Sequence, residues 1–195
     1  MKMTTLLAGV LFASGVIATA QEKAPTPVAE VGFNYSYARV NPGGALSSFN
    51  QSGGSGYVAY NINRVVGVVA DLGAYHNGSI SNIQSGSTTF SYLFGPRFNW
   101  RMSRVTPYVQ VLVGGARLSS TYDPASATAP VGSSQNVFAA ALGGGVDIAL
   151  TQHIAVKPIQ LEYFLTQAPS STANLNYAQN NLRYSAGVVF RFGAK

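Results

Sequence analysis

The sequence contains no cysteine and few charged residues, and each shortage excludes a class of protein. Without cysteine there is no disulfide bond, no thiolate nucleophile and no cysteine metal site. Aspartate, glutamate, lysine and arginine make up only 9% of the chain, whereas a typical soluble domain has about 25%. Because a water-soluble body of this size normally covers its surface with such side chains, this chain has too few for that role.

Long apolar runs are also missing after the first twenty residues, which excludes transmembrane helices. The N-terminus itself combines a positive Lys2, an apolar stretch from Leu6 to Ile17 and a small-residue site that ends at Ala20. This order predicts a cleaved secretory signal peptide over residues 1–20, because the apolar stretch is too short for a membrane anchor. The polar, proline-containing segment 21–28 is expected to be a short linker.

The net charge of +6 does not indicate nucleic-acid binding. Such binding requires basic residues gathered on one face or along one segment. The arginines of this chain are instead scattered from Arg39 to Arg191. We therefore expect no nucleic-acid partner.

The C-terminal segment Leu182–Phe192 alternates between two kinds of side chain. Successive residues of a β-strand point to opposite faces, so a period of two predicts a strand with two different faces. One face carries Leu182, Tyr184, Ala186, Val188, Phe190 and Phe192, and the other carries Arg183, Ser185, Gly187, Val189 and Arg191. Such a strand separates an apolar environment from a polar one.

Seven earlier segments have the same character. We predict strands over Ala29–Val40, Gly56–Ile62, Val65–His76, Thr88–Trp100, Val105–Leu118, Val137–Leu150 and Ile154–Gln167. The connections between them alternate between long polar loops and tight turns. In an up-and-down barrel this alternation places all long loops at one end and all turns at the other.

These features predict an all-β fold, an eight-stranded antiparallel up-and-down transmembrane β-barrel over residues 29–192, followed by a short tail, 193–195. A soluble lipocalin-like barrel or β-sandwich is the alternative, and it would carry its charges outside. The polar faces here hold mostly glycine, alanine, serine and asparagine with single charges. Such small residues suit the crowded interior of a small barrel, which favours the membrane form.

The inward charges must pair, because the interior of such a barrel has room only for side chains. Counting from the tight turn at Thr151–His153 places Asp147 opposite Lys157, and Glu30 and Arg191 near one rim. The strand phase slips near Pro158, which indicates a bulge. We expect these and the other inward charges to form structural ion pairs without a catalytic role; the others are Asp71, Arg97, Glu162 and Arg183.

Two stretches carry a resemblance to a known group of proteins. The hairpin Gly145–Tyr163 and the ending Ser185–Phe192 resemble the OmpA-like or opacity-type, porin-like family of small outer-membrane β-barrels. The ending is similar to the assembly signal of such barrels through Ser185, Gly187, Phe190 and Phe192. The resemblance implies insertion by the barrel-assembly machinery into the lipid of the bacterial outer membrane, as a monomer. It implies no activity, because a fold does not give a function.

The sequence holds too few candidate catalytic residues to predict an enzyme. The sequence has two histidines, His76 beside a long loop and His153 in a tight turn, and the predicted topology places them at opposite ends of the barrel. A lipid-modifying enzyme is therefore disfavoured, and we expect no metal or cofactor.

The sequence favours a structural or surface-interaction role through the exposed loops, with an unidentified extracellular ligand. The loop residues singled out for this role are Phe49, Asn50, Gln51, Ser79, Asn82, Tyr122, Asp123 and Asn176. A small porin or diffusion channel is the alternative. Wide pores use about 16 to 18 strands, whereas an eight-stranded barrel is filled by its own side chains.

Overall fold

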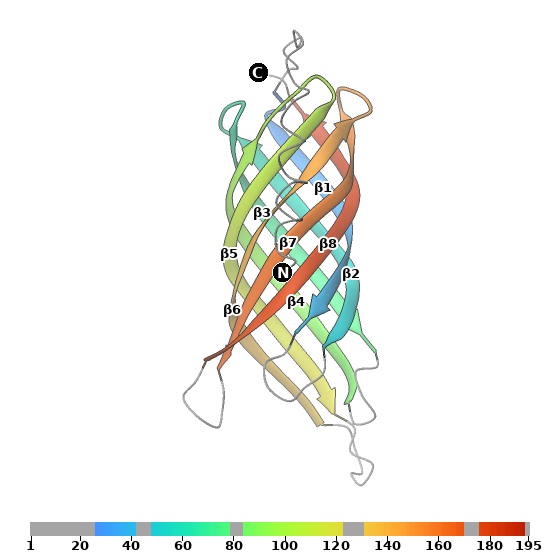
Figure 1. Ribbon diagram of the computed structural model, residues 1–195, viewed down its shortest axis with the longest axis vertical. Coiled ribbons are helices and arrows are strands. Elements are labelled where there is room, and N and C mark those ends of the chain that lie inside the picture. Colours follow the sequence, from blue (N-terminus) through green and yellow to red (C-terminus); the bar gives the residue numbers. More distant parts are fainter. Residues whose placement is uncertain (1–25, 42–47, 79–83, 123–130, 170–175, 194–195) are drawn as a thin grey trace, which may run out of the picture.

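The computed structural model describes residues 26–41, 48–78, 84–122, 131–169 and 176–193. These residues form eight strands: β1 (Ala29–Val40), β2 (Phe49–Asn61), β3 (Val66–Asn77), β4 (Gln84–Asn99), β5 (Val105–Tyr122), β6 (Val131–Ala149), β7 (Ile154–Pro169) and β8 (Asn176–Phe192). The strands form one closed barrel in sequence order (Figure 1), which confirms the predicted fold. The described part of the chain holds no helix with the length and apolar character of a membrane span.

The barrel closes where β1 pairs antiparallel with β8. The register runs without interruption from Ala29 opposite Phe192 to Arg39 opposite Leu182. The first and last strands of the sheet therefore leave no free edge along this seam. The aromatic rings of Phe33 and Phe190 meet edge-on across it on the outer face, with their centroids 6.4 Å apart.

The two faces of the wall are the reverse of those of a soluble protein. Phe33, Leu72 and Phe94 on the outside are 60%, 55% and 61% exposed, whereas Arg97 and Arg183 are 1% exposed. An exposed apolar band over buried charges is stable where the outer solvent is lipid. A lipocalin-like barrel requires the opposite arrangement, so this alternative is excluded.

The tight turns are held by side chains that accept backbone hydrogen bonds. In the β2–β3 turn, Oδ1 of Asn63 accepts from the backbone N–H groups of Val65 and Val66, each at 2.8 Å. In the β6–β7 turn, Oγ1 of Thr151 accepts from the N–H groups of His153 and Ile154 at 3.2 and 3.0 Å. Asparagine and threonine are suited to such turns because their side chains replace a backbone acceptor.

The strands extend further toward the long-loop end than the sequence predicted. β2 begins at Phe49 instead of Gly56, β6 at Val131 instead of Val137, and β8 at Asn176 instead of Leu182. In β6 the residues from Gly132 to Asn136 are all exposed. Backbone pairing continues there without an apolar face, so alternation of hydrophobicity cannot reveal these extensions.

The register of β7 shifts at Pro158, where the sequence predicted a bulge. The pairing with β8 is interrupted between Lys157 and Gln160, and the pairing of β6 with β7 is interrupted between Val146 and Ile148. Proline has no N–H to donate, so the ladder breaks at this residue. Both Lys157 and Gln160 consequently face the interior.

Substitutions on the outer face test whether this face lies in lipid or in water. Replacing Leu72, in the middle of β3, by arginine places a charge in the hydrocarbon layer, and we expect it to cost about 2–4 kcal/mol of unfolding free energy in lipid vesicles. Val65→Arg, beside the turn before β3, is the matched control and should cost about 0–1 kcal/mol. Urea unfolding followed by tryptophan fluorescence measures both values. Equal costs would contradict a lipid-facing wall.

Candidate functional site

The interior of the barrel contains all eight charged residues that the sequence placed there. Seven of them are 1–2% exposed and Arg191 is 8% exposed. They belong to strands β1, β3, β4, β6, β7 and β8, so they converge from most of the wall: Glu30, Asp71, Arg97, Asp147, Lys157, Glu162, Arg183 and Arg191. The four described carboxylates are all among them.

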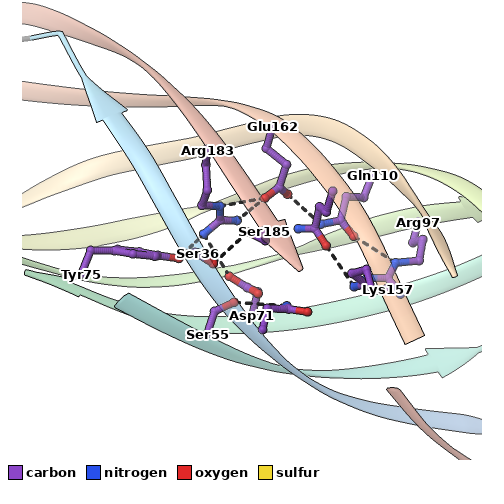
Figure 2. A network of polar contacts seen from close by, with 12 residues as sticks. Ser36, Ser55, Asp71, Tyr75, Arg97, Gln110, Lys157, Glu162, Arg183 and Ser185 are labelled. Atoms are coloured by element: carbon purple, nitrogen blue, oxygen red, sulfur yellow. Dashed lines mark hydrogen bonds and ion pairs between the residues drawn. The ribbon is translucent and has the colours of Figure 1, made fainter. Parts of the chain in front are cut away.

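One group of these residues crosses the middle of the barrel (Figure 2). From β8, Arg183 contacts Oε2 of Glu162 on β7 through Nε at 2.7 Å and a terminal nitrogen at 2.6 Å. Its other terminal nitrogen lies 3.5 Å from Oδ1 of Asp71 and donates to the hydroxyl of Tyr75 at 2.5 Å, both on β3. Arg183 therefore joins opposite parts of the wall, and we name this set of four residues the central network.

Two further contacts extend the central network toward the turn end. Gln110 donates from Nε2 to Oε1 of Glu162 at 2.8 Å, and Nε of Arg97 donates to Oε1 of Gln110 at 2.9 Å. Both oxygens of the Glu162 carboxylate are thus occupied. A buried carboxylate that accepts hydrogen bonds on both oxygens is fixed in one orientation, so these side chains form a rigid link across the lumen.

A second group lies near the tight turns and differs from the predicted pairing. The sequence set Glu30 beside Arg191, and these residues are opposite each other in the β1–β8 register. The Glu30 carboxylate instead contacts Arg101 at 2.8 Å and Arg97 at 3.7 Å. Arg101 lies just beyond β4 and reaches across the barrel, which residue spacing alone does not reveal.

Asp147 and Lys157 share the interior, but none of the four ion pairs among the described residues joins them. Nζ of Lys157 donates to Oε1 of Gln160 at 2.9 Å and lies 4.1 Å above the ring of Tyr57. The strand register shifts between Val146 and Ile148 and again between Lys157 and Gln160. Asp147 and Lys157 are therefore not paired as counting from the turn predicted. The predicted direct contact is therefore not found.

Aromatic rings complete the interior around these cations. The guanidinium of Arg97 lies 4.6 Å from the ring of Tyr57 and 4.3 Å from that of Tyr108. Tyr57 fits because β1 carries Gly32 opposite it, and a Cβ there would lie 2.1 Å from the ring. A filled interior of this kind leaves no room for a wide pore.

The long-loop end of the interior opens into a polar hollow, which we name the vestibule. It is about 240 Å³ in volume. Amides and hydroxyls dominate its wall beside three apolar side chains, and none of the described lining residues is charged: Val40, Phe49, Gln51, Ser87, Thr89, Leu118, Ser120, Ser133, Gln135 and Gln179. A small cavity of about 20 Å³ lies below it and reaches Tyr75 and Arg183. The central network thus lies below the vestibule, with this small cavity between them.

This geometry agrees with a family match over nearly the whole chain. The family described as outer membrane protein beta-barrel domain matches residues 6–192. The chain belongs to this family. The resemblance drawn from the hairpin and the C-terminal strand is thereby confirmed. A search of curated proteins found no match.

Solved structures of small outer-membrane barrels share the fold of this family member. Ail, the attachment invasion locus protein of Yersinia pestis, is 18% identical with a TM-score of 0.59, and the alignment covers 84% of this chain and 97% of Ail. Neisserial surface protein A is 17% identical with a TM-score of 0.65, with the same coverage. OprG of Pseudomonas aeruginosa is 12% identical with a TM-score of 0.52, covering 89% of this chain and 100% of OprG.

The two histidines of this outer-membrane barrel lie at opposite ends. His76 is near the loop end of β3, where Nδ1 is 2.9 Å from the hydroxyl of Thr88. His153 is in the β6–β7 turn. In the part of the chain that the structure describes, no three histidine, aspartate or glutamate residues are grouped to hold a metal ion. The four ion pairs among the described residues join Glu30, Asp71 and Glu162 to arginines.

The loop residues named from the sequence divide into three sets. Phe49 and Gln51 belong to β2 and line the vestibule, while Asn50 accepts a hydrogen bond from Arg39 at 3.1 Å. Tyr122 and Asn176 belong to strands β5 and β8. The remaining three, Ser79, Asn82 and Asp123, lie outside the described residues.

The assembly-signal residues occupy distinct positions on β8. Ser185 faces inward and its hydroxyl lies 2.8 Å from that of Ser36 on β1. Gly187 lets the backbones of β8 and β1 approach, because a Cβ there would lie 2.0 Å from the carbonyl oxygen of Phe33. Phe190 and Phe192 are on the outer face. These positions fit the seam that closes the barrel; recognition by the assembly machinery stays a prediction.

The central network predicts different losses of stability for substitutions of two buried residues, Glu162 and Lys157. Glu162→Gln removes the negative charge that holds Arg183, and breaking a buried pair in this way costs about 3–5 kcal/mol. Lys157→Met removes a cation that contacts an amide and an aromatic ring, so we expect a smaller loss. Urea unfolding in vesicles measures both. Equal losses would instead indicate that Lys157 pairs directly with Asp147.

Proposed function

We propose that the protein acts at the bacterial surface as a binding protein, with the barrel as its membrane anchor and the long-loop end as its contact surface. The observation that carries this proposal is the division of the interior. The central network crosses the barrel at mid-height, and the vestibule lies between it and the loop end. A rigid barrel that presents loops around a polar hollow is a common arrangement for binding.

The lining of the vestibule supports an uncharged polar partner group, such as a sugar residue of a surface glycan. Three glutamine side chains and several hydroxyls supply donors and acceptors, and Phe49, Val40 and Leu118 supply apolar contact. Ligand sites commonly combine a few placed polar groups with apolar surface in this way. Ail, which has a similar fold, is described in complex with the heparin analogue sucrose octasulfate, a modified sugar. That ligand is a polyanion, so the likeness supports a carbohydrate partner and not its lack of charge.

Binding is tested with the refolded chain in nanodiscs on an array of neutral and sulfated glycans that includes sucrose octasulfate. We expect saturable binding that weakens about tenfold or more in Gln135→Ala, because a polar contact of about 1.5 kcal/mol is lost. Gln152→Ala, the same change in the β6–β7 turn at the other end, is the control and should bind like the parent. Equal weakening in both variants, or no saturable glycan, would contradict a vestibule site.

The channel alternative predicts a different measurement. We expect purified monomer to give no stable open conductance in planar bilayers, because Arg183 joins β8 to β3 and β7 across the lumen. Arg183→Gln is the comparison variant, since it removes the cation that links the two carboxylates. A steady open conductance in the unmodified protein would overturn the proposed role in favour of a diffusion channel.

A further inference from the structure

The turn end of the barrel contains a second hollow that the proposed surface role does not use. This mouth cavity has a volume of about 430 Å³, far more than the roughly 30 Å³ that one water molecule occupies in the liquid. Its polar wall comes from the β4–β5 turn, the β6–β7 turn and the end of β8: Ser103, Arg104, Thr151, Gln152, His153 and Arg191. Among the described residues, no carboxylate lines it.

Arg191 is the decisive residue of the mouth cavity. Its side chain is 8% exposed, and its Nε and one terminal nitrogen have no hydrogen-bond partner. The carboxylate opposite it in the strand register, Glu30, is held by Arg101 at 2.8 Å and Arg97 at 3.7 Å. Glu30 and Asp147 attract the Arg191 guanidinium electrostatically, but among the described residues neither forms an ion pair with it. Buried N–H groups without an acceptor in a native fold call for a missing partner.

The charges around the mouth cavity specify the sign of that partner. Arg104 is exposed on its wall, and no ion pair among the described residues involves either Arg104 or Arg191. Asp147 also lies in the interior, but it does not line the cavity and makes no ion pair with Arg191. Glu30 and Asp147 offset part of the charge of Arg191 from within the barrel, but the described lining itself carries two arginines and no carboxylate, so the cavity side favours an anion.

The arrangement of hydrogen-bond donors in the mouth cavity indicates which chemical group it binds. A guanidinium presents parallel N–H groups that match the two oxygens of a carboxylate or phosphate. Hydroxyl groups of Ser103 and Thr151 and the ring of His153 stand on the same wall. We propose that the mouth cavity binds an oxyanion, a carboxylate or phosphate group presented from the side of the short turns.

The test uses the refolded chain in neutral detergent micelles, with phosphate and acetate titrated against chloride at constant ionic strength. We expect a saturable shift of the Arg191 Nε–Hε resonance in nitrogen–proton spectra. Arg191→Gln should abolish saturable binding, and Arg104→Gln should raise the Kd about tenfold, since a hydrogen bond to a charged group is lost. Arg39→Gln at the loop end is the matched control and should leave the Kd unchanged.

Two outcomes would overturn the proposal. The first is the absence of a saturable shift both in micelles and in nanodiscs that contain phosphatidylglycerol, and the second is an unchanged Kd in Arg104→Gln. Because Arg104 is exposed on a turn, this variant keeps the test valid even where Arg191→Gln fails to fold.

A comparison of binding in micelles and in nanodiscs identifies the source of the oxyanion. Binding of phosphate in lipid-free micelles supports a soluble or polymer-borne group that enters from the turn side. Binding only in nanodiscs that contain phosphatidylglycerol supports the phosphate of a lipid headgroup. Glycan binding at the vestibule is measured at the other end of the barrel, so failure of either proposal leaves the other intact.

Discussion

The structure depends on the closure of β1 against β8. In hydrocarbon no water satisfies a free N–H or C=O group, so a sheet crosses a membrane only when its two edges pair with each other. The continuous register from Ala29 opposite Phe192 to Arg39 opposite Leu182 provides this pairing. Closing the sheet with eight strands then limits the interior to the width of its own side chains. Small inward residues and paired charges follow from that limit.

The limited interior also determines where the charges of the protein lie. The four described carboxylates are all buried in the barrel with Arg97, Arg101, Arg183, Arg191 and Lys157. The other described cations, Arg39, Arg64, Arg104 and Arg117, are outside this interior set, at the loop end or the turn end. The apolar band between them carries no charge that would have to enter lipid. Both ends of the described barrel therefore carry positive charge, and both proposed binding sites lie at these ends.

The sequence predicts the wall of the barrel better than its interior. The bounds of β1 and the inward direction of Arg97 follow from alternation alone, because each residue reports its own face. Contacts across the lumen depend on strand tilt and on the bulge at Pro158, so neither the Glu30–Arg101 pair nor the separation of Asp147 from Lys157 could be counted from the turns. Arg101 shares the parity of Arg97 and Asn99, which was the one available signal for it.

The central network makes a closed lumen compatible with the proposed surface role. Opening the lumen requires Arg183 to leave Glu162, and separating a buried pair costs about 3–5 kcal/mol unless new partners replace it. Since about 1.4 kcal/mol corresponds to a factor of ten in an equilibrium constant, fewer than about one molecule in a hundred would have an open lumen. The same contacts tie β3, β7 and β8 together beneath the vestibule. The rigidity that blocks a pore thus fixes the strands from which the long loops rise.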